Sequence, residues 1–403
     1  ILYLIRSIFF TDHHSSWKVF TTNSLLGVII IVLFFFRYLL GDAALFKPLF
    51  HNFTIFHFLA FSLLILEISR LRIDFVVRIF NPAQLFIVSF GFIILCGALL
   101  LKMPLSTYSP ISFTDAFFTS TSAVCVTGLT VVDTATRFTT LGKLIIISLI
   151  QIGGIGVVTI TSFFGIFFKE TSSFREQMLI RDYLSEDSFT GILKTLIKVI
   201  LITFSIELIG TAFIFFSLYN DELGSVGADL RFSIFHSVSA FCNAGFSTLT
   251  DNFYDTRVRD NYNLQYCIAN LIVLGGLGFP VFLNIYNYLK AQVILLWEYI
   301  KYRKPYVHRV GMITFNTKIV VITTFILLLF GTISIFLLEY NVTQKDVSIS
   351  GKIAMSYFSS VTPRTAGFNN VNMEALTKAT MLVMIFLMWV GASPVSTGGG
   401  VKT

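Results

Sequence analysis

The chain contains 403 residues, of which 55% are hydrophobic and 13% are charged, roughly half the charged fraction of an ordinary soluble domain. This composition excludes a soluble core and predicts an all-α membrane protein with several spans. The formal net charge of +7 does not indicate a nucleic-acid partner, because the basic residues stand in short loops between apolar runs, as is typical of membrane topology.

The first 80 residues contain two apolar runs, Val19 to Leu40 and Phe53 to Ile68, joined by a short polar link. We expect these runs to form an extra transmembrane helical hairpin in residues 1–80. Asn81-Pro82 then gives a typical helix start. Because residue 1 is Ile and the chain stops just after a glycine run, we also expect the natural protein to be longer.

From Pro82 onward one pattern returns three times: an apolar span, a short semi-polar segment, a glycine and a second span. A repeat of this kind predicts one structural unit used three times, and we divide the chain into pore repeats at 81–190, 191–300 and 301–403. The expected spans are Gln84–Leu101, Lys143–Phe168, Leu196–Tyr219, Leu264–Leu289, Lys318–Leu338 and one from near Thr380.

The short segments between the spans are Phe113–Ala123, Phe232–Phe241 and Ile353–Val361. Each holds about ten residues, half of the ~20 that a helix needs to cross the hydrocarbon. We therefore expect each segment to enter the membrane and return. A half-span leaves backbone groups unpaired, which is tolerated only beside protein or water, so the pattern implies an aqueous pore.

A glycine follows each short segment, at Gly128, Gly245 and Gly367. The negative C-terminal end of each short helix would point toward the pore centre and favour a cation. Glycine permits the backbone conformations that turn successive carbonyls to the axis, where they can replace a cation's hydration shell. We therefore predict an ion-binding filter formed by Val126, Thr127, Gly128, Leu129, Asn243, Ala244, Gly245, Phe246, Thr365, Ala366, Gly367 and Phe368.

Polar residues near the filter have weaker assignments. Asp133 and Asp251 are expected at the outer mouth, where they would concentrate cations, although ordinary solvated loop acids would look the same. Arg364 stands at the offset of Cys125 and Cys242, and we expect it behind the loop, bonded to carbonyls or a carboxylate. The two cysteines are expected to pack rather than to bind metal.

A second glycine cluster follows each filter, at Gly153–Gly156, Gly275–Gly278 and Gly391–Gly400. In the first two units we expect these glycines to let helices pack closely. In the third, Pro394 and the surrounding glycines should break the helix. This break predicts a gate loop formed by Gly391, Ala392, Ser393, Pro394, Ser396, Thr397, Gly398, Gly399, Gly400 and Lys402.

Charge counts predict the orientation. The edges 67–82, 169–198 and 289–318 carry 14 Lys and Arg and 8 acids, whereas 102–143, 219–262 and 339–380 carry 10 and 11. The first set is therefore expected on the cytoplasmic side. Glu207 is the lone acid within the spans. It is interpreted either as structural, paired with Lys198 or with an adjacent helix, or as a relay or coupling site. No acid pair or Ser/His set converges on the spans, so no enzyme is indicated.

The residues from about Asn81 to Thr403 resemble the Trk/Ktr/HKT family of potassium transporters. The resemblance is carried by SAVCVTGLTVVDT, FCNAGFSTLTDNF, SVTPRTAGFNNV, GASPVSTGGGVKT and RVGMITFNTKIV. It implies four helix, pore-loop, helix units around one pore, with Gly128, Gly245 and Gly367 as the first three filter glycines. Gly391 to Thr403 would be the gating loop of the third unit, and a fourth unit is expected beyond Thr403.

The resemblance also implies a homodimer in the bacterial inner membrane, working with a cytosolic ring of nucleotide-binding regulatory subunits. Potassium would be the transported substrate at the filter, with no covalently bound cofactor. Gly128 favours potassium, because a serine at this position accompanies sodium transport in plant relatives. A sodium-permeable or sodium-coupled transporter remains the first alternative, and a non-transporting membrane subunit or a membrane enzyme the second.

Overall fold

The computed structural model describes residues 82–167, 189–218, 225–302, 313–345, 347–394 and 396–402. Clustering of its contacts separates two compact units, Ile1–Asn81 and Pro82–Thr403, and all the described residues belong to the second. The predicted N-terminal hairpin lies outside the described residues, as do residues 303–312 of the basic segment Lys290–Lys318.

The described residues form helices and connecting loops, without a β-strand among them. In chain order the helices are α6 (Pro82–Leu101), α7 (Phe113–Val124), α8 (Thr134–Arg137), α9 (Thr140–Phe167), α11 (Phe189–Ser217), α12 (Val226–Phe241), η2 (Asn252–Tyr254), α13 (Tyr262–Leu277), α14 (Phe279–Tyr302), α15 (Phe315–Glu339), α16 (Ile349–Val361), η3 (Met373–Ala375) and α17 (Lys378–Trp389). The all-α fold predicted from composition is confirmed for the described residues.

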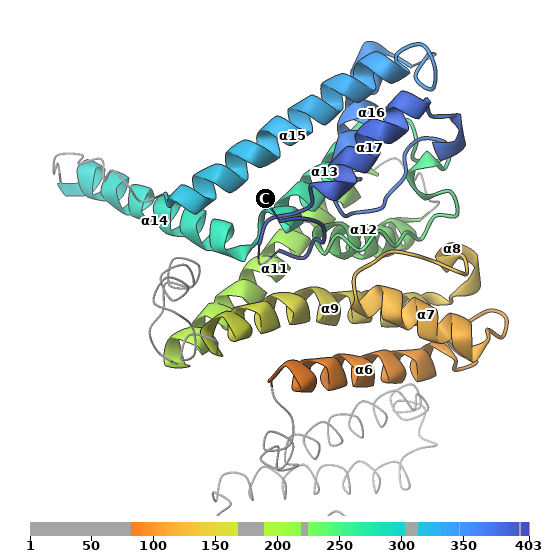
Figure 1. The fold of residues 1–403 in the computed structure, drawn as a ribbon, viewed down its shortest axis with the longest axis horizontal. Coiled ribbons are helices and arrows are strands. Elements are labelled where there is room, and N and C mark those ends of the chain that lie inside the picture. Colours follow the sequence, from red (N-terminus) through yellow and green to blue (C-terminus); the bar gives the residue numbers. More distant parts are fainter. Residues whose placement is uncertain are drawn as a thin grey trace, which may run out of the picture. The chain divides into compact units, whose positions relative to one another are not determined.

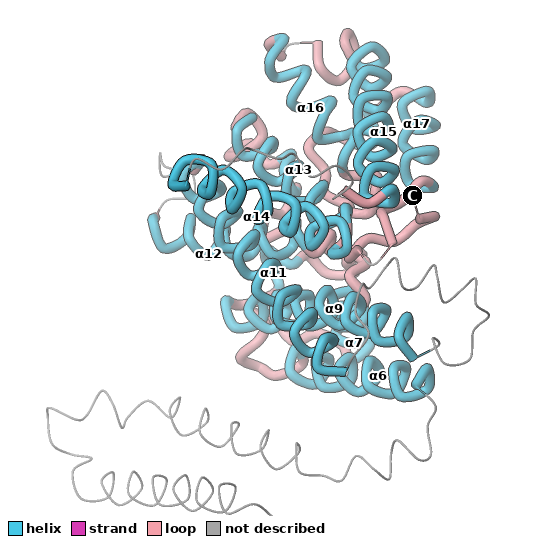
Figure 2. The backbone as a smooth tube through the Cα atoms, turned by 90° about the vertical axis from the view of Figure 1, so that its left-hand side faces the viewer, coloured by secondary structure: helices cyan, strands magenta, loops and turns pink. Residues whose placement is uncertain are grey.

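Each of the three short helices α7, α12 and α16 packs against at least two other helices. α7 contacts α6 and α9, α12 contacts α11 and α13, and α16 contacts α15 and α13. Figures 1 and 2 show these groups as successive layers of the described unit, with α9 against α12. The loops that follow α12 and α16 are thereby largely buried, whereas the loop that follows α7 stays partly exposed, with Leu129 62% exposed.

The start of each short helix is fixed by a serine. Ser112, Ser225 and Ser348 have extended backbones, and their hydroxyls accept hydrogen bonds from Asp115, Ala228 and Gly351 N–H groups at 3.0–3.2 Å. Such caps satisfy amides that the first helical turn leaves unpaired. The predicted start of the second segment at Phe232 was therefore wrong, because Ser225 caps a helix that begins at Val226, six residues earlier.

By length and composition, two of the described helices can cross a membrane alone, Ile197–Ser217 within α11 and Phe315–Glu339. α13 and α14 pass the same test only as a pair, and they meet at a bend of 97°. The shorter apolar helices include Ile87–Leu101, Thr140–Gly156 and Lys378–Trp389. Their exposed Leu, Ile and Phe side chains suit a lipid environment.

The prediction of one continuous span over Leu264–Leu289 was wrong. α13 ends at Leu277, and Gly278 has φ 81° and ψ 151°, a conformation that essentially only glycine adopts. Pro280 follows in the first turn of α14, where it has no N–H to donate to the carbonyl of Gly276, four residues earlier. Glycine and proline together therefore turn the chain at this point.

Candidate functional site

The three glycine loops, residues 125–129, 242–246 and 364–368, share an unusual backbone. The glycines have φ of 83°, 72° and 82°, and the residues two positions earlier, Val126, Asn243 and Thr365, have φ of 55°, 59° and 96°. Outside these positions, Asn252 is the sole non-glycine residue with positive φ in the described part of the chain. Such strained residues cost roughly 1–3 kcal/mol each and tend to mark functional sites.

The structure brings the three loops together. A methyl group added at Gly128 would lie 2.4 Å from the Ala244 carbonyl oxygen, and one at Gly245 would lie 2.3 Å from the Ala366 oxygen. A methyl group at Gly367 would lie 3.9 Å from Gly245 Cα. The backbones thus approach one another so closely that a side chain at Gly128 or Gly245 would displace the neighbouring loop.

Hydrogen bonds from the short helices hold the loops. Thr127 N–H donates to the Ser122 carbonyl and Ala244 N–H donates to the Ser239 carbonyl, both at 2.8 Å. The Ser239 hydroxyl also donates to the Phe246 carbonyl at 2.8 Å, and Thr362 Oγ1 donates to the Phe368 carbonyl at 2.7 Å. The last two contacts fix the carbonyls of the residues that follow Gly245 and Gly367.

A buried aromatic cluster supports the second and third loops. His236 on α12 has Nδ1 2.9 Å from the Phe232 carbonyl and Nε2 3.0 Å from the Ser247 hydroxyl. Its ring packs against Phe253 and Phe368, with centroids 5.3 and 6.4 Å away. A ring nitrogen beside a carbonyl must donate, so we assign the hydrogen to Nδ1, and Nε2 accepts from Ser247.

The third glycine cluster ends its helix, as predicted: α17 stops at Trp389. The following glycine-rich loop, Val390–Lys402, folds back on itself through hydrogen bonds from Gly391 N–H to the Val401 carbonyl and from Ala392 N–H to the Gly399 carbonyl, both at 3.1 Å. All ten residues predicted for the gate loop lie in this compact turn.

The glycine-rich loop docks on the broken end of α13 (Figure 1). Ser393 N–H donates to the Gly276 carbonyl at 3.0 Å, and the Ser393 hydroxyl donates to the Leu277 carbonyl. Pro280 cannot donate to Gly276. The bend thus frees helical carbonyls that the loop then satisfies.

The glycine-rich loop also reaches the glycine loops. Thr397 Oγ1 lies 3.3 Å from the Phe241 carbonyl, the Gly275 carbonyl and the side-chain amide of Asn243, and its one hydroxyl hydrogen can be donated to either carbonyl. A methyl group at Gly398 would lie 2.5 Å from Thr365 Oγ1. The loop therefore lies directly against the second and third glycine loops.

Arg364 ties the third glycine loop to the glycine-rich loop. Its guanidinium donates to the Gly391 carbonyl at 2.9 Å and to the Val390 carbonyl at 3.4 Å, and the residue is 9% exposed. Partners of this kind agree with the sequence prediction of a cation held behind the loop by carbonyls.

The glycine clusters of the first two units receive the ends of the short helices. A methyl group at Gly153 would lie 2.0 Å from the Val124 carbonyl, and one at Gly275 would lie 1.9 Å from the Phe241 carbonyl. These contacts confirm close packing at both positions. At the second cluster the chain also bends, at Gly278. The sequence had predicted a helix break only in the third unit.

Glu207 on α11 lies behind the second glycine loop and is 4% exposed. Its carboxylate accepts a hydrogen bond from Gln151 Nε2 of α9 at 3.1 Å and lies 4.0 Å from Cys242 Sγ. The partner is thus on an adjacent helix, one of the two possibilities considered from sequence, and Lys198 is not bonded to it. Gln151 was missed, since nothing local in the sequence pairs it with Glu207.

The two predicted outer acids differ in their surroundings. Asp133 caps α8, accepting from Ala135 N–H at 2.9 Å and from Thr136 Oγ1 at 2.8 Å. Asp251 precedes η2, is exposed, and forms no side-chain cap. Asp133 therefore has a local structural role, whereas the Asp251 carboxylate faces solvent.

Comparisons with known proteins agree with this architecture. The family model described as "TrkH: Cation transport protein" matches residues 51–403. The chain is 35% identical to the Ktr system potassium uptake protein B of Bacillus subtilis, over 80% of this chain and 68% of the relative. It is also 35% identical to the potassium/sodium uptake protein NtpJ of Enterococcus hirae, over 80% and 67%.

Among solved structures, the crystal structure of the potassium transporter TrkH from Vibrio parahaemolyticus has a TM-score of 0.58. The match covers 94% of this chain and 72% of that one, at 18% identity. The chain spans about two thirds of the length of the two relatives named above.

Proposed function

The chain belongs to the TrkH family of cation transport proteins, and from this premise we propose that it takes up potassium through a filter built from its glycine loops. It is an ion transporter and not an enzyme, and potassium is the transported ion of the family. The observation that carries the filter assignment is the paired positive φ in three loops whose backbones meet at Gly128, Gly245 and Gly367.

Positive φ at every second residue, as at Val126 and Gly128, turns neighbouring carbonyls toward one side of a chain, which a run of ordinary φ values does not allow. Carbonyls so arranged can replace the hydration shell of potassium. We assign the ion contacts to residues 126–129, 243–246 and 365–368. Asp251, and Asp133 beside its capping role, would raise the cation concentration at the outer mouth.

We assign gating to the glycine-rich loop Val390–Lys402. It lies against Asn243 and Thr365 of the glycine loops, so an ion leaving the filter would meet it next. Its attachments are hydrogen bonds rather than a packed apolar core, which suits a segment that must move. Residues 81–190, 191–300 and 301–403 would form three pore repeats.

Sodium passage is the second candidate, because one of the two relatives at 35% identity is named a potassium/sodium uptake protein. Gly128 in the first glycine loop favours potassium over sodium as the transported ion. We further propose a homodimer in the plasma membrane with a cytosolic nucleotide-binding regulatory ring. The relative from Bacillus subtilis is named as part of a Ktr system, and Lys290 and Lys301 of α14 are exposed for such a contact.

The test is growth at low potassium in a strain without its own uptake systems, with the gene read to its natural stop codon. Wild type should rescue growth, while Gly128→Ser and Gly245→Ser should weaken it at equal amounts in the membrane. Comparing sodium and rubidium influx then separates the two candidates. Failure of the wild type to rescue, despite its reaching the membrane, would remove potassium uptake as the function.

A further inference from the structure

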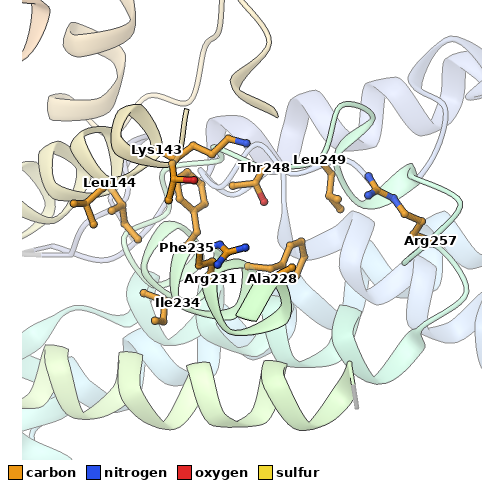
Figure 3. Close-up of a pocket in the computed structure, with 12 residues that line it drawn as sticks. Lys143, Leu144, Ala228, Arg231, Ile234, Phe235, Thr248, Leu249 and Arg257 are labelled. Atoms are coloured by element: carbon orange, nitrogen blue, oxygen red, sulfur yellow. The ribbon is translucent and has the colours of Figure 1, made fainter. Parts of the chain in front are cut away.

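A cavity of about 390 Å³ lies between the start of α9, α12 and the loop after the second glycine loop (Figure 3). Its volume falls in the range of small-ligand sites, roughly 300–1,000 Å³. The cavity is separate from the glycine loops and the glycine-rich loop, since its lining contains none of their residues.

Three cations line this cavity: Lys143 of α9, Arg231 of α12 and Arg257 of the following loop. Among the described residues, its lining includes no Asp or Glu. Arg257 is paired at 2.8 Å with Asp255, which is not part of the lining. Lys143 donates to the Ala135 carbonyl at 2.8 Å and is attracted by the Asp133 carboxylate, which is also outside the lining. The lining therefore carries excess positive charge and would attract an anion.

Arg231 is the clearest unmatched charge of the three. Within the described part of the chain its guanidinium makes no hydrogen bond or ion pair. An arginine presents five donors in a planar fork that fits phosphate oxygens. Figure 3 shows the Arg231 side chain near Phe235 and Ala228, below Lys143 in the view.

The other half of the lining is apolar and open to the outside. Leu144 and Ile234 are 61% and 44% exposed, and Ile147 lies one turn after Leu144 on α9. α9 begins at Thr140, so the cations stand at the end of the helix and the apolar residues further in. This order matches a lipid in a bilayer, with its headgroup at the helix end and its chains beside the span.

We propose that this cavity binds an anionic phospholipid. Its phosphodiester would lie among Lys143, Arg231 and Arg257, and an acyl chain would cover Leu144, Ile147 and Ile234. In the orientation proposed above, this lipid belongs to the outer leaflet. Because α9 and α12 come from successive repeats and meet here, the bound lipid would brace the contact between the first two repeats.

The test uses the full-length protein in neutral detergent, titrated with phosphatidylglycerol and followed by native mass spectrometry. The double variant Lys143→Gln, Arg231→Gln should bind the first phosphatidylglycerol roughly thirtyfold more weakly. Phosphatidylcholine of the same chain length should bind more weakly than phosphatidylglycerol and equally to both proteins. The pair Lys143→Arg, Arg231→Lys, which keeps both charges, should retain binding.

The control is Lys102→Gln, Lys345→Gln, which removes the same charge from exposed residues outside the lining. Equal phosphatidylglycerol affinity in the double variant and this control would overturn the proposal. So would saturation by millimolar inorganic phosphate or glycerol phosphate, because the site would then take a soluble anion. Loss of the dimer mass in the double variant, independent of lipid, would instead make the cavity a protein interface.

Discussion

Replacing Gly245 by alanine tests the filter most directly. Gly245 has φ 72°, and the new methyl group would lie 2.3 Å from the Ala366 carbonyl oxygen. The left-handed backbone costs an L-residue about 1–2 kcal/mol, and forcing a packed neighbour aside costs a further ~1–3 kcal/mol. Since Ala366 immediately precedes Gly367, the displacement passes directly into the third glycine loop.

The expected result is a loss of potassium selectivity together with slower uptake. If ~2 kcal/mol of the distortion appears as weaker binding of dehydrated potassium, the preference over sodium falls by roughly thirtyfold. The assay is rubidium uptake into proteoliposomes containing the full-length protein, with competition by potassium and by sodium. Both competition curves are measured at equal protein incorporation.

Gly91→Ala is the matched control, because a methyl group at Gly91 on α6 meets no atom within 4 Å. In a helix interior this change should be neutral or mildly stabilising, with transport as in wild type. If Gly245→Ala also transports at the wild-type rate with unchanged competition by both ions, the glycine loops do not form the filter.

The remaining predictions concern the attachments around the filter. Arg364→Met leaves the Gly391 carbonyl without its donor, so we expect basal rubidium flux to rise severalfold. Arg364→Lys should restore part of the closure of the glycine-rich loop. A fall in flux in Arg364→Met would mean that Arg364 serves only folding. Glu207→Leu leaves Gln151 Nε2 without an acceptor at a cost of about 1–3 kcal/mol, which should lower the melting temperature by roughly 5 °C. Glu207→Gln keeps an acceptor oxygen, so its melting temperature should fall much less. Equal falls in the two variants would contradict the hydrogen-bond explanation. Replacing potassium by choline should lower the melting temperature measured by tryptophan fluorescence, because an ion that binds only the folded state stabilises it by mass action. If potassium at concentrations that saturate transport leaves the melting temperature unchanged, the protein has no equilibrium ion site. Thr397→Val should free the glycine-rich loop and raise rubidium flux. Unaltered flux with unaltered stability would show that the hydrogen bonds of the Thr397 hydroxyl do not hold the loop.

Sequence alone located the short helices because their two ends carry separate local signals. The third was predicted over Ile353–Val361 and runs Ile349–Val361, and the first was predicted to end one residue before Val124. At the C-terminal ends of α7 and α12, the positive-φ residues Val126 and Asn243 follow directly after the cap residue, and α16 ends two residues before Pro363. The glycines marked these regions in the sequence. At the N-terminal ends, serine caps determine where each helix begins. Ser225 was overlooked because the apolar pattern became distinct only near Phe232.

The bend between α13 and α14 could have been predicted from one comparison within the chain. The clusters ending at Gly156 and Gly278 look alike, yet α9 continues through the first and the helix breaks at the second. Gly156 is followed by two valines, whereas Gly278 is followed by Phe279 and Pro280. Proline in the following turn removes the N–H that would have carried the helix across.

The docking of the glycine-rich loop could not be predicted from either of the segments that make it. Ser393 supplies an N–H and a hydroxyl for Gly276 and Leu277, 116 or more residues earlier in the chain. Only the fold shows that a helix broken by proline exposes carbonyls where another broken helix ends. The bend between α13 and α14 and the end of α17 therefore depend on each other. The bend leaves carbonyls unpaired, and the glycine-rich loop is positioned by donating hydrogen bonds to them. A gate attached in this way can open by exchanging a few hydrogen bonds for water in the pore, without disturbing the packed helices around it.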